Sequence, residues 1–288
     1  MQVYITADME GITGLVDAID VQPGGADYER GRASMTEDVN AAIRGAVAAG
    51  ASRVLVNDAH GPMRNLLPGE LHPAARLVRG RPKPMGMIEG LDDSFDAVLC
   101  VGYHARAGTL GVLSHSFMGH EIEDMWLDDD PVGEIGMVHA TAAALGVPVV
   151  LLTGDDAACA EMTAWDPGVA TVSVKVVRGR FAADLMPVPQ AREAIELAAR
   201  EALQAAAGTT ASPAAAPPHR TRRAPADPVT LAVRWQSASV ADMLLGIPGV
   251  TLRDSRTVQL TGTMPGLLRL FSLFISVAIP MSGQGPYC

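Results

Sequence analysis

Short apolar runs alternate with helical patterns through the first half of the chain, and this alternation constrains the fold more than any other feature. Strands are predicted at 3–8, 53–58, 97–103 and 147–155, and helices at 34–50 and 134–146. Each helix ends in glycine, a common C-terminal signal. Because the predicted strands hold few polar residues, both faces of their sheet should be covered. The pattern predicts an α/β fold whose mostly parallel sheet has helices on both faces.

The second half predicts a smaller α+β unit. After a strand at 170–177 and a helix at 189–208 come a strand in VTLAVRW, a helix around SVADMLL and a strand pair near VTLRD and TVQLTG. A Pro/Ala/Arg-rich stretch at 209–228, with HRTRR and His219, is typical of an exposed loop. We therefore expect a metal-binding catalytic domain over 1–156 and a smaller α+β domain over 157–288.

Composition limits the partners and the compartment. The net charge of −10 and pI near 5.1 argue against nucleic acid or an anionic membrane as the main partner. Three cysteines without a CxxC pair suggest neither a thiolate zinc site nor a disulfide framework. The N-terminus lacks the pattern of a signal peptide, so we expect a cytoplasmic protein.

The C-terminal region carries two further expectations. The apolar run at 267–279 contains Arg269 and is shorter than a bilayer span, so it should be a buried helix or strand. The tail at 271–288 does not show the pattern of a regular amphipathic helix.

Polar side chains follow three of the predicted strands. Asp8 and Glu10 follow the first strand, Asn57, Asp58 and His60 the second, and His104 the third. In a parallel sheet, ligands collect at the carboxyl ends of the strands, so these side chains should meet at one edge. Asp58 can instead form an Asx turn or orient His60.

Two more residues are candidates for the same edge. His115 lies one loop beyond His104, in LSHS, and Glu134 opens the helix at 134–146. A carboxylate in the first turn of a helix can be a capping charge, or it can point into the crevice.

Imidazole and carboxylate ligands without cysteine suit Zn²⁺, with Mn²⁺ or Co²⁺ as alternatives. Five ligands exceed the need of one tetrahedral zinc, whereas a bridging carboxylate with two further ligands per ion would hold two metals. An extra histidine would then be free for proton transfer. No GxSxG, GxGxxG or Walker pattern occurs, which disfavours a serine hydrolase and a nucleotide site. His72, His120, His139 and His219 are expected to be structural or exposed.

Several long segments together resemble the D-aminopeptidase DppA family, peptidase family M55. They are ADMEGITG (7–14), YERGRASMTEDVNAAI (28–43), VLVNDAHG (54–61), IEGLDDSFDAVLCVGYHARAGT (88–109), GVLSHS (111–116), PVGEIG (131–136) and VPVVLLTGDD (147–156). The resemblance implies a zinc-dependent enzyme that removes N-terminal D-residues from short peptides, with ring-like decamers that enclose the active sites.

The same resemblance assigns the site. Asp8 would bridge two zinc ions, Glu10 and His60 would complete one site, and His104 and Glu134 the other. His115 would be the catalytic residue near the scissile carbonyl. Asn57, Asp58 and Arg106 are further candidates for orienting ligands or binding substrate.

Two other functions fit the residues. The first is a different two-metal hydrolase, an amidase or a phosphoesterase, for which Arg30, Arg32 and Arg106 are nearby cations. The second is a non-catalytic, metal-loaded peptide-binding protein.

Overall fold

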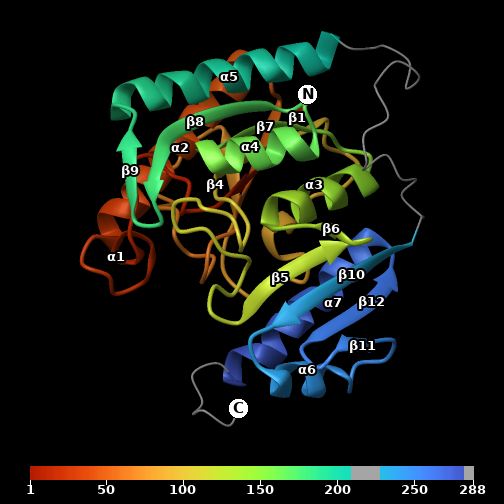
Figure 1. Cartoon of the computed structure of the whole chain (residues 1–288). Helices are drawn as coiled ribbons and strands as arrows, with labels where there is room; N and C mark the ends of the chain where they lie inside the picture. The colour runs from red at the N-terminus through yellow and green to blue at the C-terminus, as the bar shows by residue number, and fades with distance from the viewer. Residues whose placement is uncertain (209–227, 282–288) are drawn as a thin grey trace.

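Two β-sheets organise the chain in the computed structural model, which describes residues 1–208 and 228–281 (Figure 1). The HRTRR stretch, His219 and the last seven residues of the chain, 282–288, lie outside the described residues. The larger sheet has seven strands in the order β3-β2-β1-β4-β7-β8-β9. All neighbours in it are parallel except β8 and β9. Its strands are β1 (Gln2–Ala7), β2 (Arg53–Asp58), β3 (Ala75–Val78), β4 (Ala97–Tyr103), β7 (Val149–Asp155), β8 (Ala170–Gly179) and β9 (Ala182–Leu185).

Helices cover both faces of this sheet, which confirms the predicted α/β class. One face carries α2 (Tyr28–Ala48) and α5 (Val188–Gly208), and the other carries α3 (Glu134–Ala144), α4 (Asp156–Trp165) and the short helix η1 (Gly86–Ile88). Successive side chains of β1 point to opposite faces of the sheet. Val3 and Ile5 therefore join one buried cluster, and Tyr4 joins the other. A further short helix, α1 (Ala18–Val21), precedes α2.

The smaller sheet is antiparallel, with the order β11-β12-β10-β5-β6. It draws β5 (Ile122–Leu127) and β6 (Asp130–Pro131) from the first half of the chain, and adds β10 (Val229–Trp235), β11 (Thr251–Asp254) and β12 (Thr257–Gly262) from the end. The helix α6 (Ala238–Leu244) lies against it. The sheet-forming segments are therefore interleaved along the sequence.

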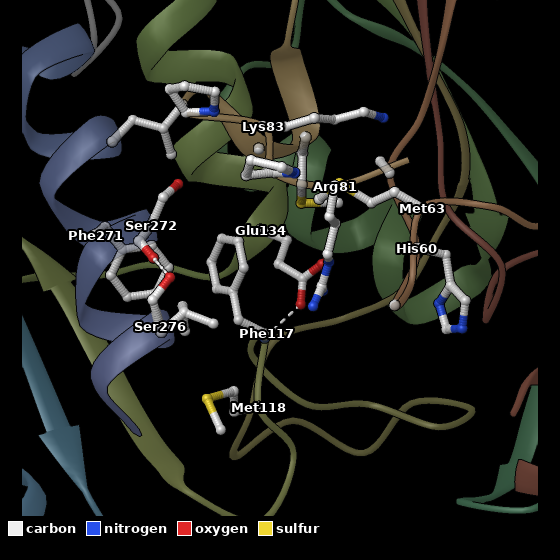
Figure 2. Close-up of a pocket in the computed structure, with 18 of the residues that line it drawn as sticks. His60, Met63, Arg81, Lys83, Phe117, Met118, Glu134, Phe271, Ser272 and Ser276 are labelled. Carbon is white, nitrogen blue, oxygen red and sulfur yellow. Dashed lines mark hydrogen bonds between the residues drawn. The ribbon is translucent and has the colours of Figure 1, made fainter. Parts of the chain in front are cut away.

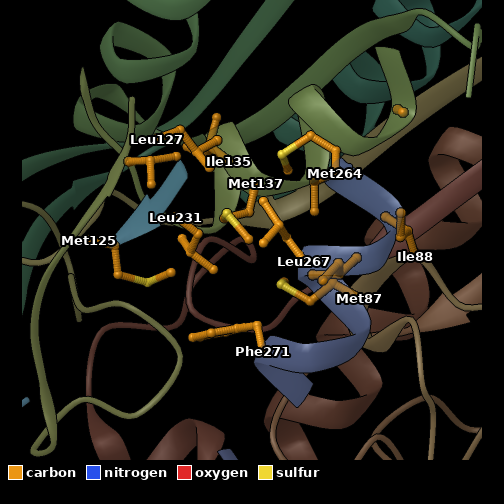
Figure 3. Packing of buried hydrophobic residues seen from close by; sticks show 14 of the residues in the cluster. Met87, Ile88, Met125, Leu127, Ile135, Met137, Leu231, Met264, Leu267 and Phe271 are labelled. Carbon is orange, nitrogen blue, oxygen red and sulfur yellow. The ribbon is translucent and has the colours of Figure 1, made fainter. Parts of the chain in front are cut away.

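The helix α7 (Met264–Ala278) packs against β12 of the smaller sheet and against α3 and η1, and it is followed by η2 (Ile279–Met281). The prediction that the tail from residue 271 lacks a regular amphipathic helix is wrong for 271–278. Leu267, Leu268, Phe271, Phe274 and Ala278 form a buried stripe at helical spacing. Figure 3 shows Leu267 and Phe271 packed with side chains of η1, α3, β5 and β10.

By length and composition alone, the stretch Met264–Met281 would be able to cross a membrane. One such helix is weak support for a membrane protein, since the core helices of globular proteins pass the same test.

Candidate metal centre

Three neighbouring strand ends carry the candidate ligands to one place. β2, β1 and β4 are adjacent, and the register pairs Ala7 with Asp58 on one side and with Val101 on the other. Asp8, His60 and His104 follow these strands within a few residues and so share one edge of the sheet.

Asp8 lies at the middle of this group. Its Oδ1 is 3.3 Å from Nδ1 of His60, and its Oδ2 is 3.3 Å from Nε2 of His104. Glu10 adds Oε2 at 3.0 Å from Nδ1 of His60, and Glu134 adds Oε1 at 3.5 Å from Nε2 of His104. Three sets of three potential ligands result. Two of them, Asp8–Glu10–His60 and Asp8–His104–Glu134, share the Asp8 carboxylate, and the third is Glu10–His104–His115.

The imidazoles are held in orientations that suit metal ligation. The other ring nitrogen of His60, Nε2, lies 3.0 Å from the carbonyl oxygen of Val21. Nδ1 of His104 lies 3.0 Å from the carbonyl oxygen of Ala105. A proton on the carbonyl-facing nitrogen leaves the opposite lone pair aimed at the carboxylates, an arrangement common in metal-binding histidines.

Two buried atoms at the centre lack a hydrogen-bond partner. They are Oδ2 of Asp8 and Nε2 of His104. Unpartnered buried polar atoms are costly, and a cation between them would satisfy both. The donor set of oxygen and imidazole nitrogen fits zinc.

Carboxylates and imidazoles lie side by side in the cluster and shift one another's pKa values. Burial alone would raise the pKa of the Glu10 carboxyl, but His60 holds it well below its usual range. Burial alone would lower the pKa values of His60 and His104. The pKa of His60 is nevertheless raised well above its usual range by Glu10 and Asp8. The pKa of His104 is raised in the same way by Glu134 and Asp8. Without a metal, protonated imidazoles therefore supply the positive charge that the carboxylates need.

Glu134 and His115 complete the group from outside the sheet edge. Glu134 is the first residue of α3, and its Oε1 accepts a hydrogen bond from the Phe117 amide at 2.5 Å. His115 stacks on His104 with a 4.2 Å centroid separation, and its Nε2 lies 3.9 Å from both Glu10 Oε1 and Glu134 Oε1. Nδ1 of His115 faces the carbonyl oxygen of Leu113 at 2.9 Å, which leaves Nε2 free. Both residues therefore point into the crevice.

Glycines allow the ligand-bearing strand ends to approach closely. Gly102 has φ +77° at an irregular register between β4 and β7, and a Cβ there would lie 2.4 Å from the Asp8 carbonyl oxygen. A Cβ on Gly11 would lie 2.0 Å from the Tyr103 carbonyl oxygen. The segments that carry Asp8, Glu10 and His104 can thus meet only with glycine at these positions.

The remaining candidates from the sequence, Asn57, Asp58 and Arg106, are outside the three sets of potential ligands. Asp58 accepts hydrogen bonds from Asn65, whose side chain donates to the His60 carbonyl oxygen at 2.7 Å. Asn57 donates to the Gly86 carbonyl oxygen and accepts from Lys83. The guanidinium of Arg106 approaches Asp124 at 3.4 Å. Asp58 therefore organises the turn that presents His60.

Two buried lysines fasten the ligand-bearing loops, and neither is among the residues that the sequence patterns single out. Nζ of Lys175, on β8, donates to the carbonyl oxygens of Glu10, Ile12 and Leu15 at 2.5–2.9 Å. Nζ of Lys83 donates to Asn57 and to the carbonyl oxygens of Asp58 and Val78. Burial lowers the pKa of each to about 8. A lysine within the apolar run ATVSVKVV was the available signal for Lys175.

A cavity of about 810 Å³ opens onto the cluster. Figure 2 shows Phe271, Ser272 and Ser276 of α7 on one side, His60 on the opposite side and Glu134 between them. Its apolar lining includes Met63, Met87, Phe117, Met118, Leu268, Phe271 and Ile275. The volume suits a small organic ligand rather than a folded protein.

Comparison with known proteins identifies the family. A family profile described as D-aminopeptidase, peptidase M55, matches residues 1–273. A D-aminopeptidase of Bacillus subtilis (strain 168) is 46% identical over 182 residues, which cover 63% of this chain and 66% of that protein. A solved structure, described as the Zn-dependent D-aminopeptidase DppA from Bacillus subtilis, a self-compartmentalizing protease, matches with a TM-score of 0.88 and 34% identity over 100% of both chains. Since the family profile spans nearly the whole sequence, this chain belongs to the D-aminopeptidase family, peptidase family M55.

Proposed function

We propose that this chain is a two-zinc aminopeptidase that releases N-terminal D-residues from short peptides or amides. The observation that carries the proposal is the sharing of Asp8 by two sets of potential ligands, with Glu10 and His60 on one side and His104 and Glu134 on the other. A carboxylate that faces both sets is the expected bridge of a two-metal hydrolase.

The relatives support the metal and the substrate class. The matched solved structure is described as a Zn-dependent D-aminopeptidase, and the aligned relative is also a D-aminopeptidase. All five proposed ligands lie within the 1–273 region that the family profile matches. We therefore take zinc as the metal and a peptide or amide bond as the target.

When bound, a pair of zinc ions supplies Lewis acidity, which makes water nucleophilic at neutral pH and polarises a carbonyl group. Asp8, Glu10, His60, His104 and Glu134 would hold that pair. His115 keeps its own place, because its Nδ1 faces the Leu113 carbonyl oxygen and its Nε2 faces the cluster. It is therefore positioned to move a proton between the reacting groups, or to stabilise the oxyanion.

Metal analysis and a substrate panel test the function together. Purified protein should hold two zinc ions per chain and should cleave D-alanyl-p-nitroanilide and D-Ala dipeptides faster than their L-counterparts. The zinc-loaded protein should leave p-nitrophenyl phosphate intact. Cleavage of the phosphate alone would replace the aminopeptidase with a phosphoesterase, and bound zinc without any cleavage would favour a peptide-binding protein.

Assembly and location are further parts of the proposal. The matched solved structure is described as self-compartmentalizing, so we propose a homo-oligomer, with a decamer as the specific expectation. Light scattering on the purified protein would give the number of chains, and a monomer would contradict the assembly. A cytoplasmic location rests on the sequence and is tested by cell fractionation.

A further inference from the structure

Arg81 lines the cavity beside the candidate metal centre without a partner among the described residues. No hydrogen bond or ion pair joins its guanidinium to any residue of 1–208 or 228–281, and Figure 2 shows its side chain pointing into the cavity. A guanidinium offers five donors, so an unpaired one that faces a ligand cavity can bind an anion.

The cavity is lined by both acidic and basic side chains. The two carboxylates in it, Asp8 and Glu134, belong to the proposed metal ligands. Lys83 has its ammonium committed to three oxygen acceptors, and Nε of Arg269 lies against the sulfur of Met85 at 3.3 Å. Arg81 is therefore the cation of this lining with the most donors free.

The surroundings of Arg81 favour an anionic ligand. Arg81 is an exposed residue, and the partial burial of its guanidinium lowers the pKa of that group. Among the described residues, no carboxylate lies within ion-pair distance of the guanidinium, so a bound carboxylate would be its ion-pair partner.

We propose that Arg81 is a substrate-binding residue that pairs with the C-terminal carboxylate of a short peptide. The assignment rests on the proposed aminopeptidase function, which places the scissile bond at the metal centre. A guanidinium binds a carboxylate through two parallel hydrogen bonds, which an amide cannot reproduce. The cavity would thereby favour short peptides with a free carboxylate, and Phe117, Met118 and Phe271 of its lining would give them apolar contacts.

The test compares an acid with its amide. Steady-state kinetics of the zinc-loaded enzyme would be measured with D-alanyl-D-alanine and D-alanyl-D-alaninamide, and the ratio of their kcat/KM values taken. In the wild type the ratio should favour the acid. Arg81→Ala should lower this ratio about 10–100-fold, mainly through KM, since a hydrogen-bonded charge contributes about 1.5–3 kcal/mol. Arg81→Lys should restore part of it.

Arg79 provides the matched control. Like Arg81, Arg79 is exposed, but it does not line the cavity. It lies two residues before Arg81 and donates to the Arg64 carbonyl oxygen at 3.0 Å. Arg79→Ala should leave the ratio within twofold of wild type. If Arg81→Ala lowers kcat/KM equally for the acid and the amide, or leaves both unchanged, the ratio does not change. That result would overturn the role of Arg81 but not the aminopeptidase function. A wild-type enzyme that cleaves neither substrate would overturn the aminopeptidase function and this assignment with it.

Discussion

At the residue scale, His115 is proposed to act in catalysis without binding the metal, so its substitution can test the two roles separately. Its Nε2 lies 3.9 Å from oxygens of both Glu10 and Glu134, whereas the two oxygens of the shared Asp8 lie 3.3 Å from nitrogens of His60 and His104. His115→Ala should lower kcat by about 10²–10⁴-fold, the usual contribution of a proton-transferring side chain. Zinc content, measured by elemental analysis, should stay at the wild-type value. Full activity in the variant would remove His115 from the mechanism.

Lys175 gives a pH-dependent prediction at the same scale. Its pKa is lowered from 10.5 to about 8 in the folded protein because it is buried. Between these two values the unfolded chain binds more protons than the folded one, so stability from this group rises with pH and is lost as pH falls through 8.

Lys175→Met isolates this effect. The variant lacks the titrating group, so the unfolding free energy of the wild type minus that of the variant should rise by roughly 1 kcal/mol per pH unit from pH 8 to pH 10. Urea denaturation at several pH values measures this difference. A difference that stays constant over this range would show that Lys175 titrates alike in both states.

At the element scale, the junction of β1 and β4 depends on Gly102. Alanine there would adopt a strained φ of +77° and place its Cβ 2.4 Å from the Asp8 carbonyl oxygen. Gly102→Ala should therefore lower both the unfolding free energy and the zinc content. Gly50, with φ +88° and open space around a Cβ, is the control for strain alone. Gly50→Ala should cost about 1–2 kcal/mol and leave zinc content unchanged. Equal behaviour of the two variants would refute the packing argument.

α7 packs against the smaller sheet and also lines the cavity. Phe271 is buried and lies 4.6 Å from Phe117, ring centroid to ring centroid. The Phe117 amide in turn donates to Glu134. The C-terminal helix thus supports the cavity wall and, through Phe117, the loop that contacts a proposed ligand.

At the scale of the whole molecule, the metal centre couples strands, loops and α3, so removing the metal should weaken the fold. Zinc that binds the folded state at 100 times its Kd adds about 2.7 kcal/mol. Chelation should therefore lower the melting temperature by roughly 5–10 °C, and added zinc should restore it. Calorimetry measures the change. Asp8→Asn should lose most of this response, and a melting temperature insensitive to chelator would contradict a structural contribution of the metal.

Much of the sheet edge was predictable from the sequence, because the relevant signals are local. Apolar runs determine the parallel strands, and residues directly after a parallel strand must lie at its carboxyl end. Asp8, Glu10, His60 and His104 could therefore be grouped from the order of residues along the chain. The position of Glu134 was open between helix capping and the crevice, since a helix N-terminus accommodates either.

Local patterns in the chain were enough for the α/β class and the set of candidate ligands, but not for the contacts between distant segments. Long-range packing decided that β5 and β6 pair with strands from the chain end, that Lys175 reaches the Glu10 loop, and that α7 and Arg81 line one cavity. These contacts join residues far apart in the chain, 165 positions in the case of Lys175 and Glu10. No periodicity or spacing encodes such contacts, because they depend on which surfaces bury one another.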